Sequence, residues 1–117
     1  ALGALRESLG GAGKHSVVLV ATEGGREVAV NGTMGSDHGS GGAAFALGGA
    51  VAGGRVIADW PGLSKPQRFE GRDLRVTTDL RAVMKSVLAD HLKLPSATIE
   101  NTVLPGSAAV KKLSLLA

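Results

Sequence analysis

The sequence predicts an α/β fold in which a partial, mostly parallel sheet is flanked by helices. Two observations carry this prediction. The run Val17–Val20 is uninterrupted and apolar, which is typical of a strand covered on both faces, as in a parallel sheet. The segment Asp79–Leu94 repeats apolar residues at helical spacing, with charged residues on the opposite face. Because 117 residues are a normal length for one domain, we expect residues 1–117 to form a single domain.

The elements of the N-terminal half follow from short apolar runs. Leucines at helical spacing predict a helix over Leu2–Leu9, which ends at Gly10–Gly11. The strand at Val17–Val20 follows. Ala43–Leu47 predicts a second buried strand beside it, and Arg55–Ala58 a third short strand.

The C-terminal half predicts one long helix and a docked tail. Thr78 is the expected N-cap of the helix over Asp79–Leu94, and Pro95 ends it. Each buried Leu or Val contributes about 1.5–3 kcal/mol, so we expect this helix to pack across the strands. A last short strand is expected within Thr98–Leu104, and the tail Val110–Leu116 is apolar enough to dock. The apolar stripe of the helix consists of Leu80, Val83, Met84, Val87, Leu88, His91 and Leu92.

Composition excludes several classes of function. The absence of Cys excludes disulfides, thiolate metal sites and a Cys nucleophile. Only 3% of residues are aromatic, and the basic residues behind the net charge of +3 are scattered. Neither feature suits a nucleic-acid-binding surface, so we expect no nucleic acid partner. No apolar run approaches the ~20 residues of a membrane-spanning helix, so we expect no transmembrane segment.

A glycine-rich loop over residues 23–42 gathers polar side chains directly after a buried strand, and the alternation at Val28–Val30 predicts a small hairpin within it. Ligands of open α/β sheets bind beyond the carboxyl ends of the strands. Adjacent Asp37 and His38 are residue types that bind Zn²⁺, Mn²⁺ or Fe²⁺. The alternative is a turn in which Asp37 bonds its own backbone and His38 is solvated.

Several spaced motifs, taken together and in order, resemble the C-terminal part of the bacterial DUF1501 family of unknown function, which belongs to the alkaline-phosphatase/sulfatase-like superfamily. The resemblance covers roughly Val17 to Leu94, and it departs from the family at Gly24, where Phe is usual. The motifs are Thr22-Glu23-x-Gly25-Arg26, Asn31-Gly32, Gly35-Ser36-Asp37-His38-Gly39, Gly48-Gly49-x-Val51-x-Gly53-Gly54-Arg55-Val56, Asp59-Trp60-Pro61-Gly62-Leu63 and Glu70-Gly71-Arg72-Asp73-Leu74-x-Val76-Thr77-Thr78-Asp79-Leu80-Arg81.

The resemblance implies that the chain is the C-terminal portion of a larger domain that is exported, by a twin-arginine signal, to the periplasm or the medium. It implies that Asp37 and His38 bind a divalent metal (Zn, Mn, Mg or Ca), while the nucleophile and the first metal-binding Asp lie outside this chain. His91, the only later histidine, lies on the helical stripe, where a core or boundary role is expected. The metal shell is therefore incomplete, and we expect the isolated chain to be inactive on phosphate and sulfate esters.

Two hypotheses of function follow. In the first, the chain is part of a metal-dependent phosphate or sulfate ester hydrolase, with Asp37 and His38 as metal ligands and Glu23, Arg26 and Asn31 near the substrate. Glu23 and Arg26 can alternatively pair with each other. In the second, the chain is a non-catalytic binding or assembly module, and the glycines serve close packing. In either case the expected partner is the missing N-terminal part of the protein or a second copy of the chain.

Three further features have structural interpretations. Trp60 is expected to be a packing anchor or a docking surface. Arg72 and Asp73 are expected to form a structural turn. Asp79 and Arg81 are expected to serve the start of the helix.

Overall fold

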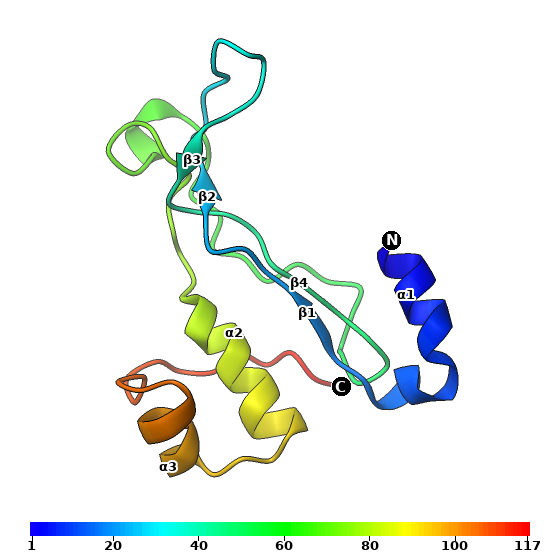
Figure 1. Ribbon diagram of the computed structural model, residues 1–117. Coiled ribbons are helices and arrows are strands. Elements are labelled where there is room, and N and C mark those ends of the chain that lie inside the picture. The colour runs from blue at the N-terminus through cyan, green and yellow to red at the C-terminus, as the bar shows by residue number, and fades with distance from the viewer. The chain divides into compact units, whose positions relative to one another are not determined.

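The computed structural model describes residues 1–117 and has a mixed α/β architecture, as predicted (Figure 1). The helices are α1 (Leu2–Leu9), α2 (Leu80–Ser86) and α3 (Ser96–Thr98), and the strands are β1 (Val18–Val20), β2 (Gly25–Arg26), β3 (His38–Gly39) and β4 (Phe45–Leu47). Short 3₁₀ segments cover Gly10–His15 and Lys65–Gln67, and π-helical turns cover Val87–His91 and Ile99–Val103. No helix has the length and apolar character needed to span a bilayer.

The predicted parallel sheet is wrong. β1 pairs with β4 and β2 pairs with β3, in two separate two-stranded antiparallel sheets. The prediction that Val17–Val20 and Ala43–Leu47 form neighbouring strands is confirmed, but neither strand is covered on both faces. β1 is half-buried throughout, and Phe45 is 60% exposed. The connection between them contains a hairpin and no helix, whereas a parallel pair needs a long crossover that is usually helical.

The chain divides into two compact units. Unit 1 comprises Ala1–Leu19, Ala46–Arg55 and Asp79–Ala117, and unit 2 comprises Val20–Phe45 and Val56–Thr78. Unit 1 contains the three helices and the C-terminal tail. Unit 2 contains the hairpin of β2 and β3, which includes the predicted polar loop.

The long helix predicted over Asp79–Leu94 forms as α2 and the π-helical turn that follows it. Asp79, not Thr78, is its N-cap, because the Asp79 carboxylate accepts a hydrogen bond from the backbone N–H of Arg81 at 2.9 Å. The helix stops before Leu92, and Lys93 takes a left-handed conformation with φ of 57°. His91 is half-buried at the end of the turn, which confirms its expected boundary position.

The most buried face of α2 is displaced from the predicted apolar stripe. The buried residues are Ala82, Lys85 and Ser86, while the stripe itself is half-buried and Leu92 is 56% exposed. Ser86 Oγ lies 2.9 Å from the carbonyl oxygen of Ala82 and 2.7 Å from that of Leu113. The buried face of α2 differs from the predicted apolar stripe because α2 packs on the backbone of the C-terminal tail, and the polar backbone groups of the tail need hydrogen-bonding partners.

Lys85 is the centre of a polar cluster in unit 1. Its ammonium group donates hydrogen bonds to Glu100 Oε1 at 2.9 Å, to the Ser107 carbonyl at 2.8 Å and to the Val110 carbonyl at 2.9 Å. Lys85 is 7% exposed, and a buried ammonium requires such a complete set of acceptors. The cluster ties α2 to the turn after α3 and to the start of the tail.

The tail docks as predicted over Val110–Leu116. Leu115 is buried, and its carbonyl accepts a hydrogen bond from the backbone N–H of Ala52 at 2.9 Å. Leu116 forms an antiparallel bridge with Val51. These contacts place the tail against the residues that follow β4.

Two predicted strands are wrong. Arg55–Ala58 is irregular, and Thr98–Leu104 is helical, since it contains the end of α3 and the π-helical turn Ile99–Val103. Pro95 is the N-cap of α3, so a fresh helix starts there. β-branched residues favour a strand only where a partner strand is available, and neither segment has one.

Candidate functional site

A hairpin forms in the polar loop as predicted, but its strands are Gly25–Arg26 and His38–Gly39, and Val28–Val30 lies outside them. A third segment of unit 2 joins it. In the antiparallel register of β2 and β3, Gly25 lies opposite Gly39 and Arg26 lies opposite His38. The backbone N–H of Leu74 donates to the Arg26 carbonyl at 3.1 Å. The hairpin is therefore hydrogen-bonded to the segment around Leu74 as well as within itself.

Three glycines permit this packing because backbone fills the space where their side chains would lie. A Cβ added to Gly25 would lie 2.3 Å from the Gly41 carbonyl oxygen. A Cβ on Gly39 would lie 2.5 Å from the Arg26 carbonyl carbon, and one on Gly41 would lie 2.5 Å from the Leu74 carbonyl oxygen. The glycine-rich sequence around the Asp-His pair thus reflects close backbone contact.

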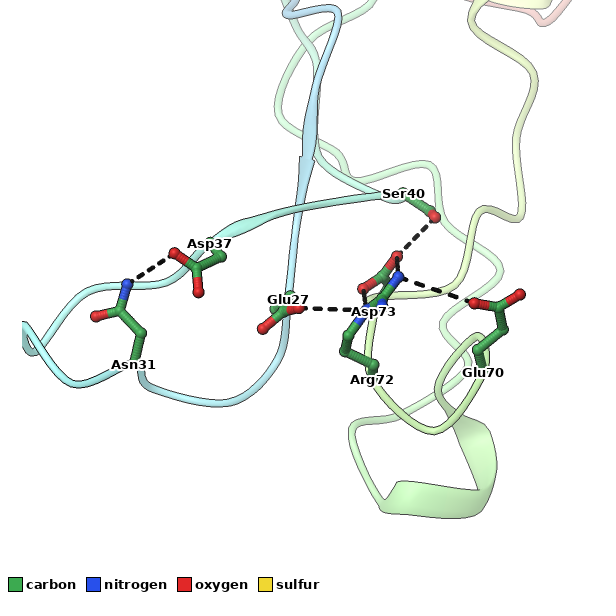
Figure 2. Close-up of polar contacts among 7 residues, drawn as sticks. All are labelled: Glu27, Asn31, Asp37, Ser40, Glu70, Arg72 and Asp73. Carbon is green, nitrogen blue, oxygen red and sulfur yellow. Dashed lines mark hydrogen bonds and ion pairs between the residues drawn. The ribbon is translucent and has the colours of Figure 1, made fainter.

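Asp37 is exposed, and Asn31 holds its carboxylate (Figure 2). Asn31 Nδ2 donates a hydrogen bond to Asp37 Oδ1 at 3.0 Å. Asn31 Oδ1 in turn accepts from the backbone N–H groups of Thr33 and Gly35, each at 3.0 Å. The turn around Asp37 is therefore organised by Asn31, and not by a bond from Asp37 to its own backbone.

His38 lies exposed on β3. A Cβ added to Gly24 would lie 3.1 Å from His38 Nδ1, so glycine at this position leaves room for the imidazole. Asp37 directly precedes β3, and its carboxylate is hydrogen-bonded to Asn31 and not to His38.

The alternative pairing of Glu23 with Arg26 is not formed. Arg26 Nη1 instead donates to the Ser36 carbonyl at 3.2 Å. Glu23 is exposed and has no ion-pair partner. The structure therefore brings Asn31 to Asp37 and places Arg26 opposite His38, while Glu23 is not joined to Arg26.

The donor atoms of Asp37 and His38 suit a divalent metal, but their number does not suffice. No group of three or more His, Asp and Glu side chains in the structure is arranged to hold a metal ion. Protein metal sites usually have about three or four protein ligands.

The most buried polar group of unit 2 is Asp73, which is 2% exposed (Figure 2). Ser40 Oγ donates to Asp73 Oδ2 at 2.8 Å, and Arg72 Nε donates to Asp73 Oδ1 at 2.7 Å. Arg72 also lies 3.2 Å from Glu27 Oε1 and 3.8 Å from Glu70 Oε2. The expected turn at Arg72 and Asp73 is confirmed, but its burial and its link to Ser40 depend on distant contacts that leave no local signal in the sequence.

The ionised form of Asp73 is stabilised by its neighbours. The hydrogen bond from the Arg72 guanidinium, followed by that from the Ser40 hydroxyl, lowers the pKa of the Asp73 carboxyl below its ordinary value. The same pairing raises the pKa of Arg72. The folded state therefore favours the charged pair.

This shift predicts a pH-dependent stability. The pKa of Asp73 is lower in the folded chain than in an unfolded chain, where it is about 3.9. The ionised Asp73 carboxylate therefore stabilises the fold fully at pH values above the unfolded-state pKa. This stabilisation is lost as the pH falls through the folded pKa. Urea unfolding of the intact protein should therefore show wild type more stable than Asp73→Asn at pH about 6, with a smaller difference at pH about 3. A difference that stays constant between the two pH values contradicts the shift.

The fold and the loop define a small mixed α/β chain with a glycine-packed hairpin that presents an Asp-His pair. Residues 1–103 match the family model described as "Protein of unknown function (DUF1501)". The chain therefore belongs to the DUF1501 family, as its motifs predict. No curated protein and no solved structure matches the chain.

Proposed function

We propose that the chain is part of a phosphate or sulfate ester hydrolase of the alkaline-phosphatase type, and that Asp37 and His38 supply two ligands of its divalent-metal site. The main support is the hairpin itself, which is fixed by backbone packing and has exposed His38 on its second strand and exposed Asp37 directly before it. The resemblance of the motifs to that superfamily suggests the class of reaction. A bound divalent metal would supply Lewis acid chemistry at a phosphoryl or sulfuryl oxygen.

The other predicted residues have different parts in this proposal. Asn31 orients the Asp37 carboxylate through its hydrogen bond and is better suited to this task than to direct substrate contact. Arg26 keeps a positive charge at the hairpin, and a guanidinium suits the oxygens of a phosphate or sulfate group. Glu23 is exposed at the entry to the hairpin. The remaining metal ligands and the nucleophile must come from residues outside 1–117, and export to the periplasm or the medium belongs to the same proposal.

Metal content tests this proposal. In the intact protein, Asp37→Ala or His38→Ala should lower metal occupancy by at least about tenfold at limiting metal, because each removes a ligand. Mass spectrometry of the purified proteins measures the occupancy. The matched controls are Asp59→Ala and His15→Ala, which remove an exposed carboxylate and an exposed imidazole elsewhere in the chain. Occupancy that is equal in all five proteins assigns Asp37 and His38 to a structural turn.

One observation favours the alternative of a non-catalytic assembly module. In unit 2 the segment after Arg55 leaves large apolar side chains exposed, with Val56 at 90%, Trp60 at 63% and Leu63 at 48%. Exposed apolar patches often mark interaction sites. If assembly is the function, Trp60→Ala should change the oligomeric state of the intact protein in light scattering while Asp37→Ala leaves it unchanged.

A further inference from the structure

We propose that Asp73 is a positioning residue that, through Ser40, fixes β3, the strand that contains His38 and directly follows Asp37. The inference rests on the proposed function only for what Asp37 and His38 bind. The position of the strand follows from contacts within unit 2.

The Ser40 side chain links Asp73 to the end of β3 by a well-formed hydrogen bond. Ser40 directly follows β3, and its hydroxyl donates to Asp73 Oδ2 at 2.8 Å across 33 positions of sequence. Asp73 is almost completely buried, so its carboxylate needs hydrogen-bond donors in fixed places. Arg72 supplies one donor and Ser40 the other. The demand of the buried carboxylate thus determines where Ser40 lies.

The need to balance the charge of Arg72 does not by itself explain why a carboxylate is buried at Asp73. Arg72 already lies near the carboxylates of Glu27 and Glu70, both of which are more exposed than Asp73. What distinguishes Asp73 from these two acids is its bond to Ser40 (Figure 2). We therefore infer that Asp73 serves to position β3 and not to neutralise the Arg72 guanidinium.

The position of Ser40 matters because it holds the register of β3. The backbone N–H of Glu27 donates to the Asp37 carbonyl at 3.0 Å, and that of Gly41 donates to the Leu74 carbonyl at 2.8 Å. These bonds hold the residues on either side of β3, but the strand itself is only two residues long. A shift of one residue would turn every side chain of a strand to the other face. The bond between Ser40 and Asp73 opposes that shift and keeps His38, and Asp37 directly before it, in their positions.

A matched set of variants of the intact protein tests this role. Ser40→Ala removes the hydroxyl and Ser40→Thr keeps it, while Asp73→Asn removes the charge. Asp79→Asn is the control, because it removes a carboxylate with a similarly lowered pKa in unit 1. The readouts are hydrogen exchange of the Glu27 amide, which bonds the Asp37 carbonyl, and the affinity for Mn²⁺.

We expect Ser40→Ala and Asp73→Asn to speed exchange at Glu27 about tenfold and to weaken Mn²⁺ binding about tenfold. Ser40→Thr and the control should resemble wild type. If Ser40→Thr behaves like Ser40→Ala, or if neither readout changes in Ser40→Ala, the positioning role is overturned. If wild type binds no Mn²⁺, the proposed metal site fails, and exchange at Glu27 still decides the role of Asp73. If Asp73→Asn does not fold, the comparison of the two Ser40 variants decides it.

Discussion

Replacing Gly25 with alanine is expected to disrupt the hairpin and lower the free energy of unfolding by about 3 kcal/mol. The added Cβ would lie 2.3 Å from both the Gly41 carbonyl oxygen and the Ser40 carbonyl carbon. These are backbone atoms of the neighbouring strand, so no side-chain rotation can relieve the clash. The strands must separate, and the hydrogen bond from the Arg26 amide to the Gly41 carbonyl, 2.9 Å long, is lost with them.

Gly32→Ala is the matched control for this prediction. Gly32 lies in the same hairpin, no atom lies within 4 Å of its added Cβ, and its φ is not positive. A substitution at such a position changes stability by about 0.5 kcal/mol or less. Urea unfolding of the two variants measures the difference. Equal stabilities of Gly25→Ala and Gly32→Ala would refute the close backbone packing of the hairpin.

Replacing Lys85 with methionine is expected to destabilise unit 1 by about 3 kcal/mol. Methionine has a similar length but cannot donate hydrogen bonds. The substitution leaves the Ser107 and Val110 carbonyls without their donor and leaves Glu100 without its counter-charge. Buried groups that lose a partner cost the full penalty of their desolvation.

The control for this second prediction is Lys112→Met. Lys112 also forms an ion pair, with Asp90, but its side chain is 50% exposed. Exposed pairs contribute about 0–1 kcal/mol, so this variant should unfold close to wild type in thermal and urea experiments. A loss in Lys112→Met as large as that in Lys85→Met would show that burial does not determine the cost.

Local patterns in the sequence predict the elements that depend on neighbouring residues. The predicted helix at Leu2–Leu9 is confirmed. Its signals, the leucine spacing and the glycines that follow, depend only on residues a few positions apart. The pairing of the strands at β1 and β4 is confirmed for a similar reason, since two apolar runs predict it. A hairpin forms in the polar loop, but at Gly25–Arg26 and His38–Gly39 and not at the predicted Val28–Val30 alternation.

Local sequence patterns do not predict features that depend on contacts between distant residues. An apolar run such as Val17–Val20 does not show the direction of its partner strand or whether both of its faces are covered, so the predicted parallel sheet is wrong. The β-branched segment Thr98–Leu104 becomes helical because it has no partner and because Pro95 starts a new helix. The burial of Asp73 depends on Ser40, and no local pattern links the two residues.

We propose that the hairpin presents Asp37 and His38 to a divalent metal. A crystal structure of the intact protein, soaked with Mn²⁺ and measured for anomalous scattering, tests this directly. We expect a manganese peak at bonding distance from the Asp37 carboxylate and the His38 imidazole, with a further ligand from outside residues 1–117. A manganese peak held by other residues, with Asp37 and His38 both in solvent, would contradict it.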